Sequence, residues 1–277
     1  MQVAMIDDKI VPEAELEPIY NDRGIYFGDG VYEVLRSYNG KIFALEEHLQ
    51  RFARSLSEIG IVNVDIDQIR SRIKKAFDAA GISNARIYFH ITRGSAPRSH
   101  TWKANLKPNF FLTVMELSDG AEERSKGISV STHPDLRWKR CDIKSLNLLA
   151  NVLARQDAAQ KDCAEAILVD EAGLITEGAG SAFFAVLGQS LQTAPLTANI
   201  LPSVTRKFVI EAGKNIGLKT VEKSLMPRQA SCADELFIAV TTKGIVPVVK
   251  FDGEVIGDGK PGKYTRLLMQ EFCSFTL

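Results

Sequence analysis

The residue with the clearest potential for covalent chemistry is Lys144. It lies in a window of apolar and small residues, 143–146, shortly after the cations Arg137, Lys139 and Arg140. A lysine is a useful nucleophile only when its amine is neutral part of the time, which requires partial desolvation or neighbouring positive charge. This segment is compatible with both conditions, although a solvated basic loop is the simpler interpretation of any single lysine.

Three other segments have the composition of an anion-binding site. Residues 203–205 open a predicted helix with hydroxyl groups, and the free N–H groups of a helix N-terminus attract phosphate. Thr241 and Thr242 end a predicted strand, and Arg51 could supply positive charge. Each alone has a structural explanation, since an N-cap residue usually only caps its helix. Together with an imine-forming lysine, they predict a phosphorylated aldehyde cofactor, pyridoxal phosphate.

Other charged residues could contact the ring of such a cofactor and its substrate. Glu177 precedes the small residues 178–181, which let the backbone approach a ring, and a carboxylate there would keep a pyridine nitrogen protonated. On composition alone, a glutamate in a surface turn is the simpler interpretation. Arg98 and His100 lie in a proline-containing loop and could bind a carboxylate, the arginine through two hydrogen bonds. A solvated loop explains that pair equally well.

The overall composition excludes several classes of protein. The 277 residues are 45% hydrophobic and 25% charged, which suits one large globular domain or two modest ones. Lys and Arg together number 34, as do Asp and Glu, so the formal net charge is zero. A protein that coats nucleic acid or a membrane surface would need an excess of cations. Neither kind of partner is therefore expected.

The cysteines and the N-terminus bear on the cellular location. The four cysteines are scattered, without the spacing of a zinc site or a disulfide framework. The N-terminus becomes charged too early for a signal peptide, and no apolar run approaches the roughly 18 residues of a membrane span. These features predict a cytoplasmic enzyme without a metal.

The first part of the chain predicts an α/β unit. Amphipathic patterns predict helices over 45–59, with Arg51 on the polar side, and over 66–80. Strands are expected over residues 3–6, 10–11, 31–38, 41–43, 86–93 and 109–117. The last of these is apolar enough to be buried on both faces. The glycines before the strand at 31–38 lack the spacing of a dinucleotide-binding motif.

A polar segment without periodicity, residues 118–127, predicts a linker between two domains. We therefore expect a small N-terminal domain over 1–117 and a larger C-terminal domain over 128–277, with a cofactor cleft between them. Helices of the second domain are predicted over residues 147–160, 200–217 and 264–275, and strands over residues 128–132, 164–169, 174–177, 183–186 and 235–240.

Taken together, these segments resemble the fold-type IV pyridoxal-phosphate enzymes, and specifically the D-amino-acid aminotransferases, along essentially the whole chain. The most specific match is the segment 137–149, from Arg-Trp-Lys-Arg-Cys-Asp-Ile-Lys onward. The other matching stretches are residues 22–34, 47–51, 92–100, 176–178, 204–206 and 234–237. The resemblance implies an α+β fold of two α/β domains with pyridoxal 5'-phosphate in the interdomain cleft.

The resemblance also implies roles for individual residues. Lys144 is similar to the Schiff-base lysine that shuttles a proton between the substrate Cα and the cofactor C4′, and Glu177 to the partner of the pyridine nitrogen. The other cofactor-binding positions match Arg51, Ser181, Leu201, Val204, Thr205 and Thr241. The substrate-binding positions match Tyr32, Val34, Arg98 and His100. In the family the last two reach in from the neighbouring subunit, which implies a homodimer.

The implied activity is ping-pong transamination between a D-amino acid, such as D-alanine, and a 2-oxo acid, such as 2-oxoglutarate. The carboxylate trap of Tyr32, Arg98 and His100 distinguishes these enzymes from branched-chain L-aminotransferases. The alternatives on the same fold are a branched-chain L-amino-acid aminotransferase and an aminodeoxychorismate lyase. A non-catalytic anion-binding protein is the alternative from another class. Residues 179–180 and Val240 replace serines of the family, which predicts weaker retention of the cofactor.

Overall fold

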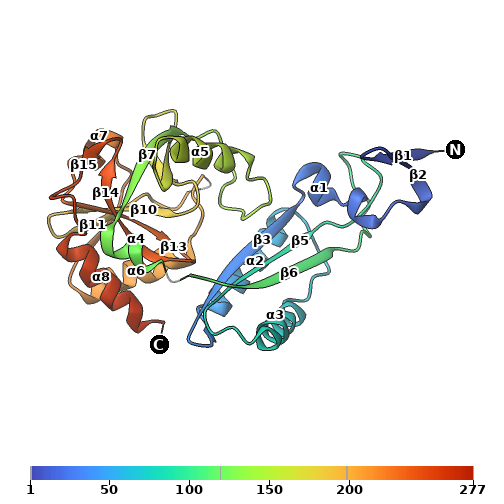
Figure 1. Ribbon diagram of the computed structural model, residues 1–277, viewed down its shortest axis with the longest axis horizontal. Helices are drawn as coiled ribbons and strands as arrows, with labels where there is room; N and C mark the ends of the chain where they lie inside the picture. Colours follow the sequence, from blue (N-terminus) through green and yellow to red (C-terminus); the bar gives the residue numbers. More distant parts are fainter. Residues whose placement is uncertain (1, 119, 198, 277) are drawn as a thin grey trace.

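The computed structural model describes residues 2–118, 120–197 and 199–276. Its strands form a four-stranded sheet, a nine-stranded sheet and a small hairpin of β1 (Val3–Ile6) with β2 (Lys9–Pro12). Figure 1 shows the two larger sheets side by side, with the hairpin projecting at the end farthest from the nine-stranded sheet. Within the described ranges, no helix is long and apolar enough to cross a membrane.

The smaller sheet is antiparallel, in the order β4-β3-β5-β6. Its strands are β3 (Gly30–Tyr38), β4 (Lys41–Ile42), β5 (Ala85–Thr92) and β6 (Asn109–Glu116). The helices α2 (Leu45–Glu58) and α3 (Ile66–Ala80) supply apolar side chains to its core, with Leu35, Phe52 and Phe89 fully buried. Because side chains alternate along a strand, β3 directs Glu33 into this core and its neighbours Tyr32 and Val34 to the opposite face.

Strand β6 differs from its prediction. Its length agrees, but the expected burial on both faces is wrong, since Phe111 is 48% and Met115 is 51% exposed. The strand lies at the edge of the sheet, and its alternate residues Phe110, Leu112 and Val114 pack against the core. A run of apolar residues looks the same in the sequence whether one face of the strand is covered or both are. The pattern alone therefore does not distinguish the two cases.

The larger sheet has the order β12-β11-β10-β13-β14-β7-β8-β9, with β15 on β14. Its strands are β7 (Ile128–Pro134), β8 (Glu165–Val169), β9 (Ile175–Gly178), β10 (Ala182–Leu187), β11 (Ser190–Thr193), β12 (Lys219–Glu222), β13 (Glu235–Val240), β14 (Gly244–Phe251) and β15 (Glu254–Val255). Both faces are apolar. Leu236 and Ile238 of β13 belong to one core, while Phe237 and Ala239 belong to another that includes α6 (Val204–Asn215) and α8 (Lys263–Ser274).

The remaining helices are α1 (Arg23–Phe27), α4 (Ala121–Lys126), α5 (Leu149–Gln160) and α7 (Pro227–Ala230). Helix α4 lies within the predicted linker, residues 118–127; Asp119 lies outside the described residues. This helix ends before Gly127, whose φ of 78° is left-handed, and an ion pair between Lys126 and Glu122 supports it. The division of the chain into two domains stays a prediction.

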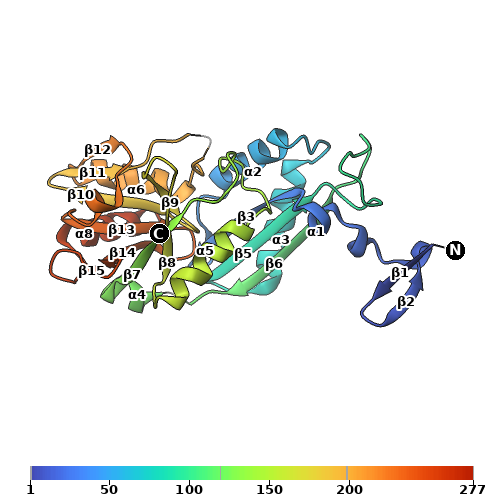
Figure 2. The same cartoon turned by 90° about the horizontal axis from the view of Figure 1, so that it is seen from above.

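Most other predicted elements are confirmed to within a few residues of their ends, including β3, α2, α3, α6 and α8. The sequence analysis missed α1, α7, β11, β12, β14 and β15. Most of these are short elements, for which local patterning is weak. Figure 2 shows the helix α5 and the strand β9 on the side of the larger sheet that faces β3 and α2.

Candidate active site

A cavity of about 190 Å³ is lined by residues of both larger sheets and of the segment before α5. It is lined by eight of the twelve residues to which the family resemblance gave roles: Tyr32, Val34, Arg51, Lys144, Glu177, Ser181, Leu201 and Thr241. Lys144, Glu177 and Arg51 therefore line the same cavity.

Lys144 is placed by a short stretch that runs beside β3. Ser145 forms an isolated antiparallel bridge with Val31, and the backbone N–H of Tyr32 donates to the Lys144 carbonyl at 3.0 Å. Ile143 anchors this stretch in the core of the smaller sheet. The Lys144 Nζ donates to the Tyr32 hydroxyl at 3.2 Å and lies 4.3 Å from the centre of that ring. The half-buried amine thus has a polar partner at the cavity wall.

The stretch can lie this close to β3 because residue 30 is glycine. A Cβ at Gly30 would stand 2.5 Å from the carbonyl oxygen of Ile91 and 2.7 Å from Leu146 Cδ1. The Leu146 N–H donates to the Gly30 carbonyl at 3.0 Å. Any larger side chain would push the Lys144 stretch away from β3.

Two of the three cations that precede Lys144, Arg137 and Arg140, are already paired. Arg140 contacts Asp142 at 3.0 Å and Glu58 at 2.5 Å. Arg137 contacts Asp135 and Glu177. Their charges are compensated, so neither stands as an uncompensated cation beside the Lys144 amine, which the sequence analysis had considered.

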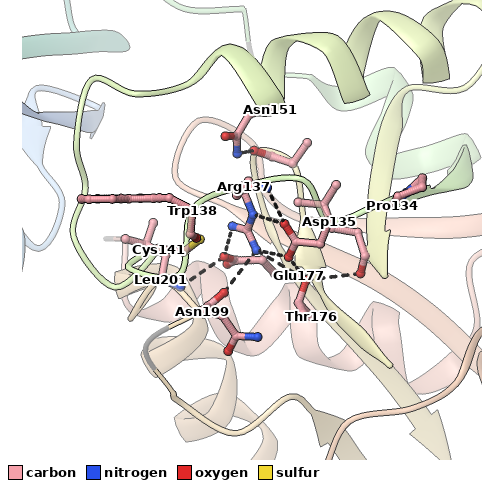
Figure 3. Close-up of polar contacts among 12 residues, drawn as sticks. Pro134, Asp135, Arg137, Trp138, Cys141, Asn151, Thr176, Glu177, Asn199 and Leu201 are labelled. Carbon is pink, nitrogen blue, oxygen red and sulfur yellow. Dashed lines mark hydrogen bonds and ion pairs between the residues drawn. The ribbon is translucent and has the colours of Figure 1, made fainter. Parts of the chain in front are cut away.

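Glu177 is buried at the end of β9, so the alternative of a surface-turn glutamate is wrong. Its Oε1 accepts hydrogen bonds from Arg137 Nη1 at 2.5 Å and from the Leu201 backbone N–H at 3.2 Å, as Figure 3 shows. Burial raises the pKa of the Glu177 carboxyl, and Arg137 and the Leu201 N–H partly offset that rise. A cationic ligand beside this carboxylate would relieve the cost of its burial.

The part of the cavity wall next to the start of α6 suits a phosphate. Ser203 caps α6 by accepting a hydrogen bond from the Arg206 N–H, and the hydroxyls of Thr205 and Thr241 lie 3.5 Å apart. Arg51 reaches the same place, since its Nη1 donates to the Pro202 carbonyl at 3.1 Å. A helix N-terminus, two hydroxyls and a guanidinium favour a doubly charged anion. Val204 and Thr205 are buried in the first turn of α6 rather than on the cavity wall.

Arg51 is buried and faces β3, although its helical position predicted the polar side of α2. The reason is Glu33, which is fully buried and binds Arg51 through two hydrogen bonds of 2.7 and 2.8 Å. His48 Nδ1 lies 2.8 Å from the same carboxylate. Burial alone would raise the pKa of Glu33, but Arg51 and His48 hold it well below its usual range. The carboxylate fixes the guanidinium at the phosphate end of the cavity.

Replacing Glu33 with Gln should therefore destabilise the protein by about 3–5 kcal/mol, because it leaves a buried arginine without its counter-charge. Since the folded-state pKa of Glu33 is lowered from its usual 4.5, this stabilisation is fully present at neutral pH and is lost progressively as the pH falls below 4.5 toward the lowered value. Thermal unfolding of both proteins between pH 4 and 8 measures the difference. Glu46→Gln is the matched control, because Glu46 pairs with Arg70 at the surface, and it should unfold as the wild type does.

Arg98 and His100 do not line this cavity. The Arg98 guanidinium lies 5.2 Å from the ring centre of Phe27, and His100 lines a second cavity of about 280 Å³ with Trp102 and Trp138. Within one described chain, the structure therefore does not bring the predicted carboxylate-binding pair together with Lys144.

The loop that carries this pair is fixed by the buried Arg23. Its guanidinium donates to the carbonyls of Ser99 at 2.6 Å, His100 at 3.3 Å and Thr101 at 3.4 Å. Asp29 holds the guanidinium at 2.7 Å. The loop is long, but the hydrogen bonds from the Arg23 guanidinium fix its backbone at residues 99–101.

Sequence reasoning did not single out several residues of the cavity wall: Trp138, Cys141, Asn147, Leu148 and Asn151. They lie within a few positions of Lys144, which is the one indication the sequence contains. The sequence analysis also mentioned Arg137 only as a cation near Lys144. Burial raises the pKa of the Cys141 thiol to about 11, so this cysteine is a neutral part of the wall. Asn151 donates to the Ala179 carbonyl at 2.8 Å and joins α5 to the loop after Glu177.

The fold and this site define an aminotransferase of class IV. The family model described as amino-transferase class IV matches residues 30–251, and the chain belongs to that family. Enzymes of this family use pyridoxal 5'-phosphate, and a lysine, a buried glutamate and an anion-binding group on the wall of one cavity fit that cofactor.

Among its relatives are D-alanine aminotransferases. The chain is 38% identical to the D-alanine aminotransferase of Bacillus licheniformis over 95% of this chain and 93% of that protein. It is 36% identical to the D-alanine aminotransferase of Staphylococcus haemolyticus over 99% and 98% of the two chains. The Escherichia coli branched-chain amino acid aminotransferase is a similar solved structure, with a TM-score of 0.86 and 25% identity over 97% of this chain and 92% of that one. These similarities confirm the predicted family and the fold-type IV class.

Proposed function

We propose that the protein transfers the amino group of a D-amino acid, such as D-alanine, to a 2-oxo acid, such as 2-oxoglutarate, by a ping-pong mechanism. The observation that carries the proposal is that Lys144, Glu177 and Arg51 line one cavity in a chain that is 38% identical to a D-alanine aminotransferase over nearly its full length. The donor amino acid leaves as a 2-oxo acid before the acceptor binds.

Each group in the cavity has a task in this reaction. When bound, pyridoxal phosphate supplies an aldehyde for the amino group and a ring that withdraws electrons from the substrate Cα. The Lys144 amine takes the proton from Cα, and the Tyr32 hydroxyl at 3.2 Å orients that amine. Glu177 holds a proton on the ring nitrogen. Arg51 would bind the phosphate together with Thr241 and the hydroxyls at the start of α6, where the buried Val204 lies in the first helical turn. Ser181 and Leu201 complete the lining of the cofactor site.

The substrate carboxylate is bound, we infer, by Arg98 and His100 of a second copy of the chain, together with Tyr32 and Val34. Two observations support a homodimer with a shared site. The pair is absent from its own cavity. In addition, α5 exposes Leu149, Val152 and Leu153 on one face, at 57% to 71% of their area, and such apolar surface is typical of protein interfaces.

A paired assay tests the function directly. The purified protein, supplied with pyridoxal phosphate, is given D-alanine or L-alanine with 2-oxoglutarate, and pyruvate is measured. We expect pyruvate from D-alanine and little from L-alanine. A preference for L-leucine would instead identify a branched-chain L-aminotransferase, and release of pyruvate from aminodeoxychorismate without an acceptor would identify a lyase. Failure to bind any pyridoxal phosphate would favour the remaining alternative, a non-catalytic anion-binding protein.

Two further statements stay predictions. One is the cytoplasmic location, with no nucleic acid or membrane partner. The other is the division into domains over residues 1–117 and 128–277, for which limited proteolysis within residues 118–127 is a direct measurement.

A further inference from the structure

We propose that Asp135 is a positioning residue of the active site, which fixes and neutralises Arg137, adds negative charge beside Glu177 and so favours a ligand with a protonated ring nitrogen. The proposal deepens the proposed function and rests on it. Its basis is a buried chain of three charged side chains, Asp135, Arg137 and Glu177, that sequence reasoning did not recognise (Figure 3).

The three side chains form one rigid unit. Asp135 follows β7, and its two oxygens accept hydrogen bonds from Arg137 Nε at 2.8 Å and Nη2 at 2.7 Å. The third nitrogen, Nη1, donates to Glu177 at 2.5 Å. All three side chains are less than 9% exposed. Thr176 adds a hydroxyl hydrogen bond of 2.8 Å to Asp135.

The charges in this unit do not cancel. Two carboxylates share one guanidinium, so the unit has an excess of negative charge in a buried place. If Arg137 had Glu177 as its only partner, the pair would be neutral and would attract a cation weakly. Because Asp135 neutralises the guanidinium, the charge of Glu177 remains effective toward the cavity. The negative charge of Asp135 also raises the pKa of the Glu177 carboxyl, so a cationic ligand beside the two carboxylates would be the group that stabilises the ionised form of Glu177.

The hydrogen bonds to the Glu177 carboxylate leave one of its two oxygens for a ligand. In the described part of the chain, the donors to this carboxylate, Arg137 and the Leu201 N–H, both bind Oε1. The residue lines the cavity, so Oε2 is the oxygen left to accept a hydrogen bond from a ring N–H. Arg137 thus fixes the orientation of the carboxylate, and Asp135 fixes Arg137.

The test compares two ligands on the apo-protein. Pyridoxal phosphate has a ring nitrogen that accepts a proton, whereas its 1-deaza analogue has a carbon at that position. Dissociation constants are measured by quenching of protein fluorescence. We expect Asp135→Asn to weaken binding of pyridoxal phosphate about tenfold, the effect of a neighbouring charge worth one pKa unit, and to leave binding of the analogue unchanged. Asp135→Glu should restore the wild-type preference.

The controls separate charge from structure. Thr176→Val removes a hydrogen bond to Asp135 without changing any charge, and it should keep the preference for pyridoxal phosphate. In a Glu177→Gln background, Asp135→Asn should have no further effect on that preference. Asp135→Ser is the second neutral variant in case the asparagine variant does not fold.

The outcomes are distinct. Equal weakening of both ligands by the neutral variants, or an unchanged preference in them, would overturn the role of Asp135. A wild-type protein that binds neither ligand would instead overturn the proposed function.

Discussion

Replacing Lys144 with Ala should reduce the rate of transamination by at least about 10³-fold, because the variant lacks the group that moves the Cα proton and general acid–base catalysis alone contributes up to about 10⁴-fold. The expected loss is in kcat, since the phosphate-binding end of the cavity is unchanged and the cofactor should still bind. The measurement is the steady-state rate with D-alanine and 2-oxoglutarate.

A chemical readout accompanies this prediction. Sodium borohydride should attach the cofactor irreversibly to wild-type Lys144, seen as a mass increase on the peptide that contains residues 141–149, and should attach nothing to the variant. Lys139→Ala is the matched control, since Lys139 is an exposed cation of the same segment, and it should keep both activity and labelling. Near-wild-type turnover in Lys144→Ala would remove Lys144 from the mechanism.

Replacing Arg98 with Met should lower kcat/KM for the amino acid by about 100-fold or more, because loss of one partner of a charged hydrogen-bonded pair costs about 2–5 kcal/mol. The more informative experiment combines two chains with different defects in one dimer. A heterodimer of Lys144→Ala and Arg98→Met, purified through two different tags, contains one site with both defects and one intact site if Arg98 reaches across. It should have about half the wild-type activity per dimer.

The alternative arrangement gives a different result. If Arg98 served its own chain, each site of the heterodimer would have one defect, and the activity would stay near that of Arg98→Met alone. A dimer of two differently tagged Lys144→Ala chains is the control for contamination and should be inactive. Elution of the wild-type protein as a monomer that is nevertheless active would contradict the shared site.

The sequence was sufficient for the residues that belong to contiguous motifs. Lys144 lies in a segment of 13 residues with a specific pattern, and the strand β3 and the helix α2 follow from periodicity. The prediction for Glu177 also came from its motif, since composition alone favoured a surface turn. Local patterns of this kind identify a residue and the element that carries it. Lys144 and Glu177, found in this way, both line the cavity.

Pairings between distant residues could not be predicted in this way. Arg51 lies on a helix whose pattern is polar at that position, and only the buried Glu33, 18 positions away on β3, explains its burial. The pairing of Arg137 with Glu177, 40 positions apart, has the same origin. Similarly, the exposure of Phe111 depends on which layer covers β6, which is a property of the whole assembly of sheets.

The anchoring of the 99–101 backbone by Arg23 affects how two chains would meet. Since the three carbonyls are already held within one protomer, the loop needs no partner to take up its shape. Association would then join two preformed surfaces, with little entropy lost from that loop. Encounter between subunits should in consequence be fast and limited by diffusion and orientation rather than by a slow folding step.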